Sequence, residues 1–481
     1  KKVKKHQNKN LVIFIAIILI ILICAFIFNF LNKQNAITST YPSDFYSGDK
    51  IITFSPALTV GQKGGISMYD KKTQKNIQLV KFNNITYGNP VLSPDNNKIV
   101  YYMGVNDKDD TNYDLWLYDI PSKENKLLAS NLTLFTGYTQ QPIWTSNSKY
   151  VYITFLDNKK NKLYKVDLNG QKSQVASSYS SNIFWPRFIN DNYLSFLTVV
   201  PCGLKEYKNY CGYDNKIGII DLKNNKVDLL NSPSGMYSSI IKEANNSNTF
   251  IKYNFSWVSV SGGITGSINQ PNNIEIISIQ NKKVLPLPVP SNINPIDSVR
   301  LSARIVCGNY MLIGKQATSS IINTPQGAGN YFVENYVYNL KTGKWSIFNN
   351  QVLHILDNKS LKCSVDDKTG KFYAYSNNSG PDGLKVIRLN LANPKEVENI
   401  DYESYLPQNM QSGFNKMCLY AQFLSGDSKP SGFAYFSIVN VQDQKCFTDN
   451  EGMQGLYYFD NKNSKATLIP NSSQFILPPN I

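Results

Sequence analysis

Apolar residues follow two different patterns along this chain. From Leu11 to Phe28 they form one unbroken run, whereas beyond residue 46 they alternate with polar residues in short segments. As a helix the run would rise about 27 Å, close to the roughly 30 Å hydrocarbon core of a bilayer. The first pattern therefore predicts one transmembrane helix, and the second predicts β-strands.

Charges beside the apolar run predict its orientation. Only Lys33 follows it closely, and it is preceded by Lys1, Lys2, Lys4, Lys5 and Lys9. Because basic residues stay on the cytoplasmic side, we expect a single-pass protein of the cytoplasmic membrane with its N-terminus inside. The predicted parts are a cytoplasmic basic tail (1–10), a transmembrane helix (11–31), a linker (32–45) and an extracytoplasmic domain (46–481).

Two other interpretations of the run remain. A cleaved signal peptide usually has an apolar stretch of about 7–15 residues and a small-x-small cleavage site. This run is longer, and residues 28–33 contain no such site, so an anchor is favoured. Cys24 could carry a lipid, but Leu22 and Ile23 stand where a small residue is expected. Cys24 is better explained as an apolar side chain of the helix.

One pattern recurs through the extracytoplasmic part. An alternating apolar strand ends in Asp or Asn and is followed by a turn rich in Lys and Asn and then by another short strand. The Asp or Asn side chain caps the turn, while Gly or Asn accepts positive φ. The copies of the strand lie at residues 66–70, 115–119, 163–167, 217–221, 274–278, 336–339, 386–390 and 456–460.

A second pattern precedes the first in several copies. Residues 90–101, 142–152 and 186–196 align on a proline, an apolar pair, a polar turn and a second apolar strand, and residues 363–374 form a later version. Each unit therefore has four short strands in about 45–60 residues, which is typical of a β-propeller blade. The fold class is all-β, with eight blades favoured between Tyr46 and Pro470, or seven if the looser copy at Ile274 is not a repeat.

The repeat resembles a known family. Ser93-Pro94-Asp95 before residues 98–101, followed by residues 114–119, is similar to the TolB-like, WD-like propeller repeat. The resemblance implies a propeller fold and protein partners. Membrane dipeptidyl-peptidase-type proteins also begin with an anchor and such a propeller, then continue into an α/β-hydrolase domain. Since this sequence ends at Ile481, we expect it to lack the hydrolase domain.

The net charge and the kind of basic residue indicate which anionic partners the protein could bind. The formal net charge is +15, and the excess is nearly all lysine. Phosphate and base recognition usually relies on arginine, so we expect no nucleic-acid partner. A weak attraction to anionic glycopolymers of the cell surface remains. The arginines are Arg187, Arg300, Arg304 and Arg388.

The cysteines fit an exported protein. All except Cys24 lie beyond the apolar run, and their even number is consistent with disulfides in an oxidising compartment. Free buried thiols are the other interpretation. The candidate pairs are Cys202 with Cys211 across a short loop, Cys418 with Cys446 within one repeat, and Cys307 with Cys363 by elimination.

The sequence contains few residues or motifs that are typical of an enzyme. The only histidine beyond the apolar run is His354, in an apolar strand pattern, and no G-x-S-x-G motif occurs. We therefore predict no catalytic residues, no cofactor and no enzyme activity. The glycine-rich residues 259–266 are expected to form an ordinary loop. A weak calcium candidate is the acidic loop with Asp107, Asp109, Asp110 and Asp114, which lacks the spacing of an EF-hand.

Aromatic residues suggest a contact surface. Tyr207 and Tyr210 lie between Cys202 and Cys211, so a disulfide would hold them in a short loop. Such a loop could contact protein or glycan. Alternatively, it could be a loop that the disulfide closes and that has no binding role.

The favoured function is therefore a membrane-anchored, non-catalytic propeller. It would present a protein- or glycan-binding surface within a cell-envelope assembly. The alternative is a ligand sensor or hydrolase-type enzyme with its site at the propeller axis.

Overall fold

The computed structural model describes most strands of the predicted extracytoplasmic part. The chain divides into two units, 1–41 and 42–481, and every described residue belongs to the second. The described residues are 50–57, 64–106, 109–134, 141–200, 214–230, 237–243, 249–260, 263–268, 274–278, 283–292, 299–317, 332–347, 361–366, 371–380, 383–401, 417–423, 432–438, 455–460, 465–470, 472 and 474–476.

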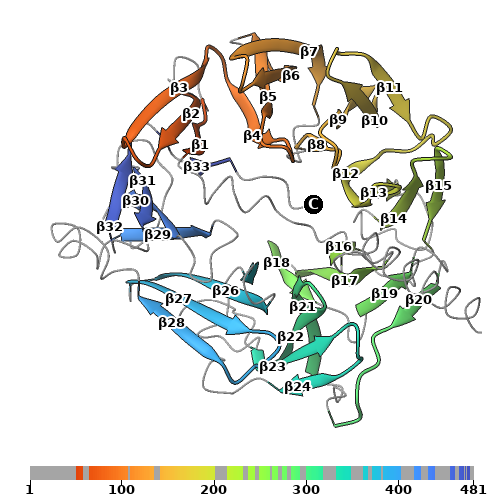
Figure 1. Ribbon diagram of the computed structural model, residues 1–481. Coiled ribbons are helices and arrows are strands. Elements are labelled where there is room, and N and C mark those ends of the chain that lie inside the picture. Colours follow the sequence, from red (N-terminus) through yellow and green to blue (C-terminus); the bar gives the residue numbers. More distant parts are fainter. Residues whose placement is uncertain are drawn as a thin grey trace, which may run out of the picture. The chain divides into compact units, whose positions relative to one another are not determined.

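The strands of this part form antiparallel sheets that follow one another in a ring, a β-propeller (Figure 1). The first sheet contains β1 (Lys50–Ser55), β2 (Gly64–Asp70), β3 (Lys75–Phe82) and β33 (Gln474–Phe475). The second contains β4 (Thr86–Leu92), β5 (Lys98–Asn106), β6 (Asp109–Asp119) and β7 (Glu124–Thr133). The third contains β8 (Ile143–Trp144), β9 (Tyr150–Asp157), β10 (Lys160–Asp167) and β11 (Lys172–Val175). The fourth contains β12 (Phe184–Asn190), β13 (Tyr193–Val200), β14 (Asp214–Asp221) and β15 (Lys226–Leu229).

The remaining sheets continue the order of the chain. The fifth contains β16 (Tyr237–Glu243), β17 (Thr249–Val260), β18 (Gly263–Ile268), β19 (Ile274–Ser278) and β20 (Lys283–Pro286). The sixth contains β21 (Val299–Cys307), β22 (Tyr310–Ala317), β23 (Phe332–Asn339) and β24 (Trp345–Ile347). The seventh contains β25 (Leu361–Asp366), β26 (Lys371–Gly380), β27 (Gly383–Asn390) and β28 (Val397–Asp401). The eighth contains β29 (Met417–Phe423), β30 (Gly432–Ile438), β31 (Gly455–Asp460) and β32 (Lys465–Ile469).

The strand nearest the C-terminus completes the first sheet. β33 pairs with β1, with Thr53 opposite Phe475 and Phe54 opposite Gln474. The hydroxyls of Thr53 and Ser472 lie 2.8 Å apart in a buried hydrogen bond. The two ends of the propeller sequence therefore meet in one sheet, which closes the ring.

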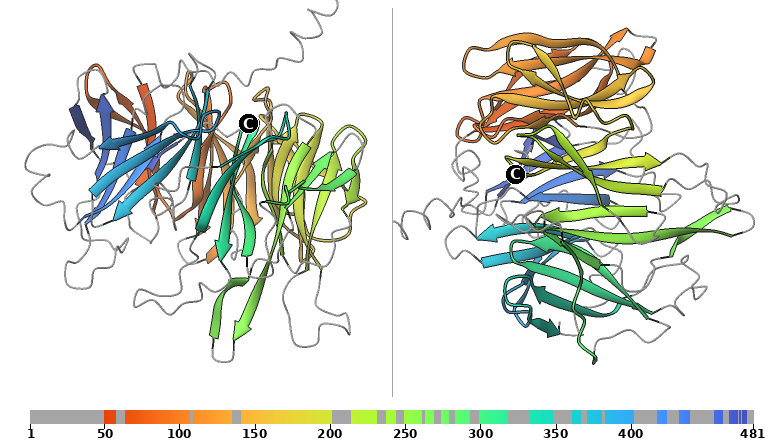
Figure 2. Two further views of the ribbon diagram at one scale, coloured as in Figure 1. Left: turned by 90° about the horizontal axis from the view of Figure 1, so that it is seen from below. Right: turned by 90° about the vertical axis from the view of Figure 1, so that its right-hand side faces the viewer.

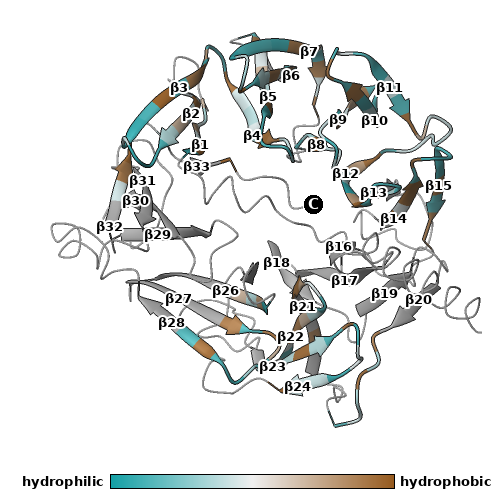
Figure 3. Ribbon diagram, in the orientation of Figure 1, coloured by the Kyte–Doolittle hydropathy of each residue, from teal (hydrophilic) through white to brown (hydrophobic). Residues whose placement is uncertain are grey.

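The core lies between neighbouring sheets. Leu92 packs in a cluster shared by the first and second sheets, whereas the adjacent Val91 packs in a cluster shared by the second and third. Successive side chains of β4 thus point to opposite faces, and both faces are buried. The outermost strands differ, because strands such as β3 and β7 are mostly hydrophilic (Figure 3).

Trp144 shows how the third sheet is fixed against the second. Its side chain is 2% exposed and packs in the cluster between these two sheets. Its indole N–H donates a hydrogen bond of 3.2 Å to the carbonyl of Val91. Apolar burial and one directed hydrogen bond therefore set the position of β8 against β4.

Each predicted copy of the capped strand is the third strand of its sheet in hydrogen-bonded order, which in the first sheet runs β33, β1, β2, β3. This includes the looser copy at Ile274, which lies in β19. The prediction of a loop at residues 259–266 is wrong, because β17 and β18 pair there as a hairpin. That hairpin extends beyond the other strands (Figure 2).

The predicted transmembrane segment, residues 11–31, lies outside the described residues. Within the described part of the chain, no helix has the length and apolar character needed to cross a bilayer.

The fit between β13 and β14 gives a test of this packing. A Cβ added to Gly218 would lie 2.1 Å from the ring of Phe196, which is itself fully buried. We predict that Gly218→Ala lowers the free energy of unfolding by about 1–3 kcal/mol through overpacking. In a urea titration, adding Phe196→Leu should restore part of this loss. Strictly additive effects of the two substitutions would contradict the predicted contact.

Candidate functional site

The turn between β4 and β5 is built by the Ser93-Pro94-Asp95 motif. The Ser93 hydroxyl donates to Asp95 Oδ1 at 2.5 Å and accepts the backbone N–H of Lys98 at 2.9 Å. Asp95 Oδ1 also accepts the N–H of Asn97 at 3.2 Å, and Asn96 has a φ of 59°. The motif therefore satisfies the polar groups of a tight turn with its own side chains.

The turn between β8 and β9 repeats this construction with different residues. The Thr145 hydroxyl donates to Asn147 Oδ1 at 2.8 Å and accepts the N–H of Tyr150 at 3.1 Å. Asn147 Oδ1 accepts the N–H of Lys149 at 3.1 Å, and Ser148 has a φ of 57°. Thr and Asn thus replace Ser and Asp without changing the turn, so the negative charge is not required for it.

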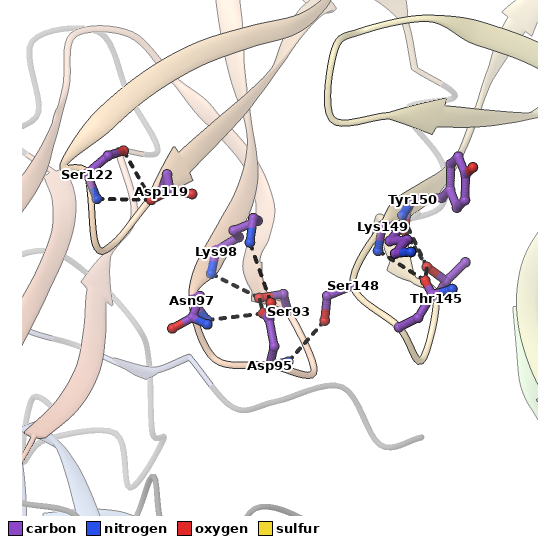
Figure 4. Close-up of polar contacts among 11 residues, drawn as sticks. Ser93, Asp95, Asn97, Lys98, Asp119, Ser122, Thr145, Ser148, Lys149 and Tyr150 are labelled. Atoms are coloured by element: carbon purple, nitrogen blue, oxygen red, sulfur yellow. Dashed lines mark hydrogen bonds and ion pairs between the residues drawn. The ribbon is translucent and has the colours of Figure 1, made fainter.

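The two turns are joined to each other. The backbone N–H of Asp95 donates to the Ser148 hydroxyl at 3.0 Å, across the boundary between the second and third sheets (Figure 4). Ser148 is 4% exposed. This contact aligns the ends of neighbouring sheets and is structural.

Turns between the third and fourth strands lie at the same end of the sheets. In six of these turns, among those that the structure describes, a side-chain oxygen at the end of the third strand accepts one or more backbone N–H groups of its own turn. Asp70 Oδ1, for example, accepts the N–H groups of Lys72 and Thr73, both at 2.9 Å. The other residues in this role are Asp119, Asp167, Asp221, Asn339 and Asn390.

These contacts shift the acid–base behaviour of the carboxylates. For Asp95, partial burial opposes ionisation, but hydrogen bonds from Ser93 and Asn97 and the charge of Lys98 outweigh it, so its pKa is lowered. Hydrogen bonds from the backbone of Thr73 lower the pKa of Asp70. The carboxylates are therefore held ionised and engaged, the opposite of a general acid poised near neutral pH.

The innermost strands decide whether acidic groups meet at the centre of the ring. Figure 1 shows β4, β8, β12, β16, β21 and β33 at the inner edges of their sheets. In the described strands that begin the sheets, the acidic residues are Glu243 and Asp366, each the last residue of its strand. Among the described residues no group of three or more His, Cys, Asp or Glu could hold a metal ion.

Uncharged and cationic groups occur on these inner strands instead. Asn89, Gln141 and Trp185 each precede a buried proline at the same point of the repeat, and Asn89 and Gln141 are exposed. Trp185 is half-buried and has a φ of 45°, at a register shift between β12 and β13. Arg187 is exposed on the same strand. The aligned prolines are visible in the sequence, but the position of the preceding residues at the inner edges of the sheets follows only from strand order.

Tyrosine–carboxylate pairs occur toward the opposite end of the sheets, one between β9 and β10 and one within β23. The Tyr164 hydroxyl donates to Asp157 at 2.6 Å, and burial together with this contact raises the pKa of Tyr164 to about 12. Tyr336 similarly donates to Glu334, which also pairs with Lys315 at 3.1 Å. Glu334 and Tyr336 lie two residues apart on β23, whereas Lys315 lies opposite Glu334 on β22, so only the lysine depends on strand pairing to be identified.

The calcium candidates are not brought together by any described contact. Asp107 lies outside the described residues, and Asp109 and Asp110 begin β6. Asp114 Oδ1 accepts the backbone N–H of Asn131 at 2.9 Å, which is a structural role. The calcium site stays a prediction.

The cysteine and tyrosine candidates are described only in part. Cys307 is buried at the end of β21 and is disulfide-bonded. Cys363 and Cys418 lie in β25 and β29, while Cys202, Cys211 and Cys446 lie outside the described residues, as do Tyr207 and Tyr210. The three pairings and the contact loop stay predictions.

The chain was compared with protein families, curated proteins and solved structures. No protein-family model and no curated protein matches the chain. Among similar solved structures, TolB from Acinetobacter baumannii is 15% identical over 56% of this chain and 62% of that chain, with a TM-score of 0.30. The β-propeller domain of the Trilobed protease from Pyrococcus furiosus is 9% identical over 88% and 92%, with a TM-score of 0.42. Dipeptidyl peptidase 4 from Porphyromonas gingivalis is 11% identical over 87% and 59%, with a TM-score of 0.46.

The chain spans less than two thirds of the TolB and dipeptidyl peptidase structures.

The lowered pKa of Asp95 predicts a specific pH dependence. Its ordinary value is 3.8, and because the folded state favours the carboxylate, its stabilising effect is present above that pH and is lost as the pH falls through the folded pKa. We expect Asp95→Asn to lower the free energy of unfolding by less than about 1 kcal/mol near neutral pH, since the group is partly exposed.

Urea midpoints measured from pH 7 down to pH 3 would test this. The difference between wild type and Asp95→Asn should become smaller as the pH falls below 3.8, because the carboxylate is then progressively protonated. Asn147→Asp, in the equivalent turn, is the matched variant and should acquire the same pH dependence. A constant gap between wild type and Asp95→Asn over the whole range would contradict the role given to Asp95.

Proposed function

We propose that this protein is a membrane-anchored, non-catalytic, eight-bladed β-propeller that presents a protein- or glycan-binding surface outside the cytoplasmic membrane. In this proposal the apolar run at residues 11–31 is the anchor, and the propeller is a component of a cell-envelope assembly. The disulfide at Cys307 supports this location, because disulfides form and persist in an oxidising compartment.

One observation carries the non-catalytic part of the proposal. An active site at the axis would need two or more carboxylates or a metal directed to the centre of the ring. The described inner strands place Glu243 and Asp366 at strand ends and otherwise carry apolar, amide, hydroxyl and basic residues. This composition favours binding over catalysis.

The acidic residues of the repeat also favour a non-catalytic function. Asp70, Asp95 and Asp221 are the residues a search for chemistry would first select, yet each accepts hydrogen bonds from its own turn. Their lowered pKa values follow from those bonds, although burial opposes the shift at Asp95 and Asp221. Stabilising their own turns is therefore enough to explain the presence of these residues.

A ligand sensor with a site at the axis is the second candidate. The exposed Arg187 and the backbone of Trp185, in a conformation unfavourable for a tryptophan, favour it. An indole, two amides and a guanidinium would suit a ligand that carries a carboxylate, bound without being altered.

Affinity capture of the tagged full-length protein from membranes tests the proposed function. A control that carries only residues 1–45 separates partners of the propeller from proteins that follow the anchor. We expect defined extracytoplasmic proteins or glycans to be enriched with the full chain, equally for wild type and Arg187→Ser. Loss of all enrichment in Arg187→Ser would favour the sensor, and no enrichment over the control would contradict the binding module.

Topology requires its own measurement. Protease added to intact spheroplasts should remove the propeller and leave the first residues in the membrane. Full protection of the propeller would contradict the proposed orientation.

A further inference from the structure

Two buried threonines lie on neighbouring sheets, the third and the fourth (Figure 1). Thr154 on β9 is 3% exposed, and Thr198 on β13 is 1% exposed. The hydroxyl oxygen of each is enclosed and makes no hydrogen bond within the described part of the chain. Buried polar groups nearly always have a partner in the protein or in ordered water, so these two hydroxyls require an explanation.

Alternation along the strands directs both threonines to the boundary between the third and fourth sheets. Tyr152 and Phe196 pack in the cluster that these two sheets share. Thr154 follows Tyr152 by two residues, and Thr198 follows Phe196 by two residues. Each threonine therefore points to the same side of its sheet as that aromatic residue, and the two threonines face one another.

The equivalent positions between the second and third sheets are aromatic. Counted from the residue opposite the capping Asp, Thr154 corresponds to Tyr102, and Thr198 corresponds to Phe155. Tyr102 and Phe155 pack in one cluster. Between the first and second sheets the same positions hold Phe54 and Met103, which also share a cluster. The boundary between the third and fourth sheets thus exchanges large side chains for small polar ones.

Asn161 adds a buried amide to this boundary. It is 0% exposed on β10 and lies two residues before Leu163, which is opposite Thr154, so it shares a sheet face with Thr154. Its Nδ2 donates to the carbonyl of Ile183 at 2.5 Å, and its carbonyl accepts the N–H of Ile183 at 2.9 Å. Ile183 directly precedes β12, whose first residue is opposite the residue before Thr198. Strand register therefore brings all three polar residues together.

We propose that Thr154, Asn161 and Thr198, here named the polar seam, bind ordered water that bridges the third and fourth sheets. Hydroxyls both donate and accept hydrogen bonds, and an amide oxygen accepts them, which suits water. Replacing a tyrosine and a phenylalanine by two threonines removes more side-chain volume than the roughly 30 Å³ of one water molecule.

The chemistry of the polar seam favours water over a cation. Calcium usually binds several carboxylates, and none of the three side chains has one. The proposed water is independent of the membrane anchor and of the partner of the propeller, so its failure would leave the proposed function untouched.

Replacing each hydroxyl by a methyl group tests the proposal. In urea titrations of the full chain in detergent, Thr154→Val and Thr198→Val should each lower the equilibrium constant for folding about fivefold, because a hydrogen bond to the water is lost. The double variant should lose less than the product of the two effects, since no hydroxyl is then left without its partner. If the hydroxyls are dry, each substitution should instead stabilise the fold, and that result would overturn the proposal.

Thr53→Val is the matched control. The hydroxyl of Thr53 pairs directly with that of Ser472 at 2.8 Å, in a different sheet. This variant should also destabilise the fold, but its effect should be additive with that of Thr154→Val. Coupling between Thr53→Val and Thr154→Val as strong as that between the two seam variants would contradict a local bridge.

A crystal structure that shows ordered solvent identifies the ligand. We expect a water oxygen about 2.8 Å from both threonine hydroxyls, absent in the double variant. A direct hydrogen bond from each hydroxyl to a protein group would overturn the proposal. So would stabilisation of the wild type by sodium or potassium chloride that choline chloride at the same ionic strength does not reproduce, because the ligand would then be a cation.

Discussion

The structure depends on the burial of both faces of every sheet between its neighbours. Val91 and Leu92 are adjacent in β4, yet one packs toward the third sheet and the other toward the first. A single sheet with two apolar faces would not be stable alone in water, so the sheets form a core only as a ring. The same constraint makes the pairing of β33 with β1 important, because it joins the last strand to the first sheet.

Polar residues of the repeat stabilise the ends of these buried sheets. The turns need their backbone groups satisfied where the strands end, and Ser93, Asp95, Thr145 and Asn147 satisfy them locally. The Asp/Asn exchange between equivalent turns indicates that geometry rather than charge is required. These side chains therefore have a structural role at the ends of the strands.

The repeat could be predicted from sequence because each local signal agrees with the fold. Alternation marks the strands, and an Asp or Asn before a Lys/Asn-rich turn marks the hairpins, as at Asp167 and Asp221. Ring closure could not be predicted, because β33 is two residues long and has no periodicity of its own. The β17–β18 hairpin was missed since glycines at 262, 263 and 266 suggested a loop. The ion pair between Lys315 and Glu334 depends on the register of β22 and β23, which only tertiary structure fixes.

Limited proteolysis of a chain that ends at Pro470 would test the central claim, that mutual burial in a closed ring holds the sheets together. Without β33 and the Thr53–Ser472 contact, we expect cleavage sites to appear in several sheets, including those far from β1 in sequence. The full-length chain should be cut only at connections between strands. Identical cleavage patterns for the two chains would contradict the account, because the sheets would then be stable without closure of the ring.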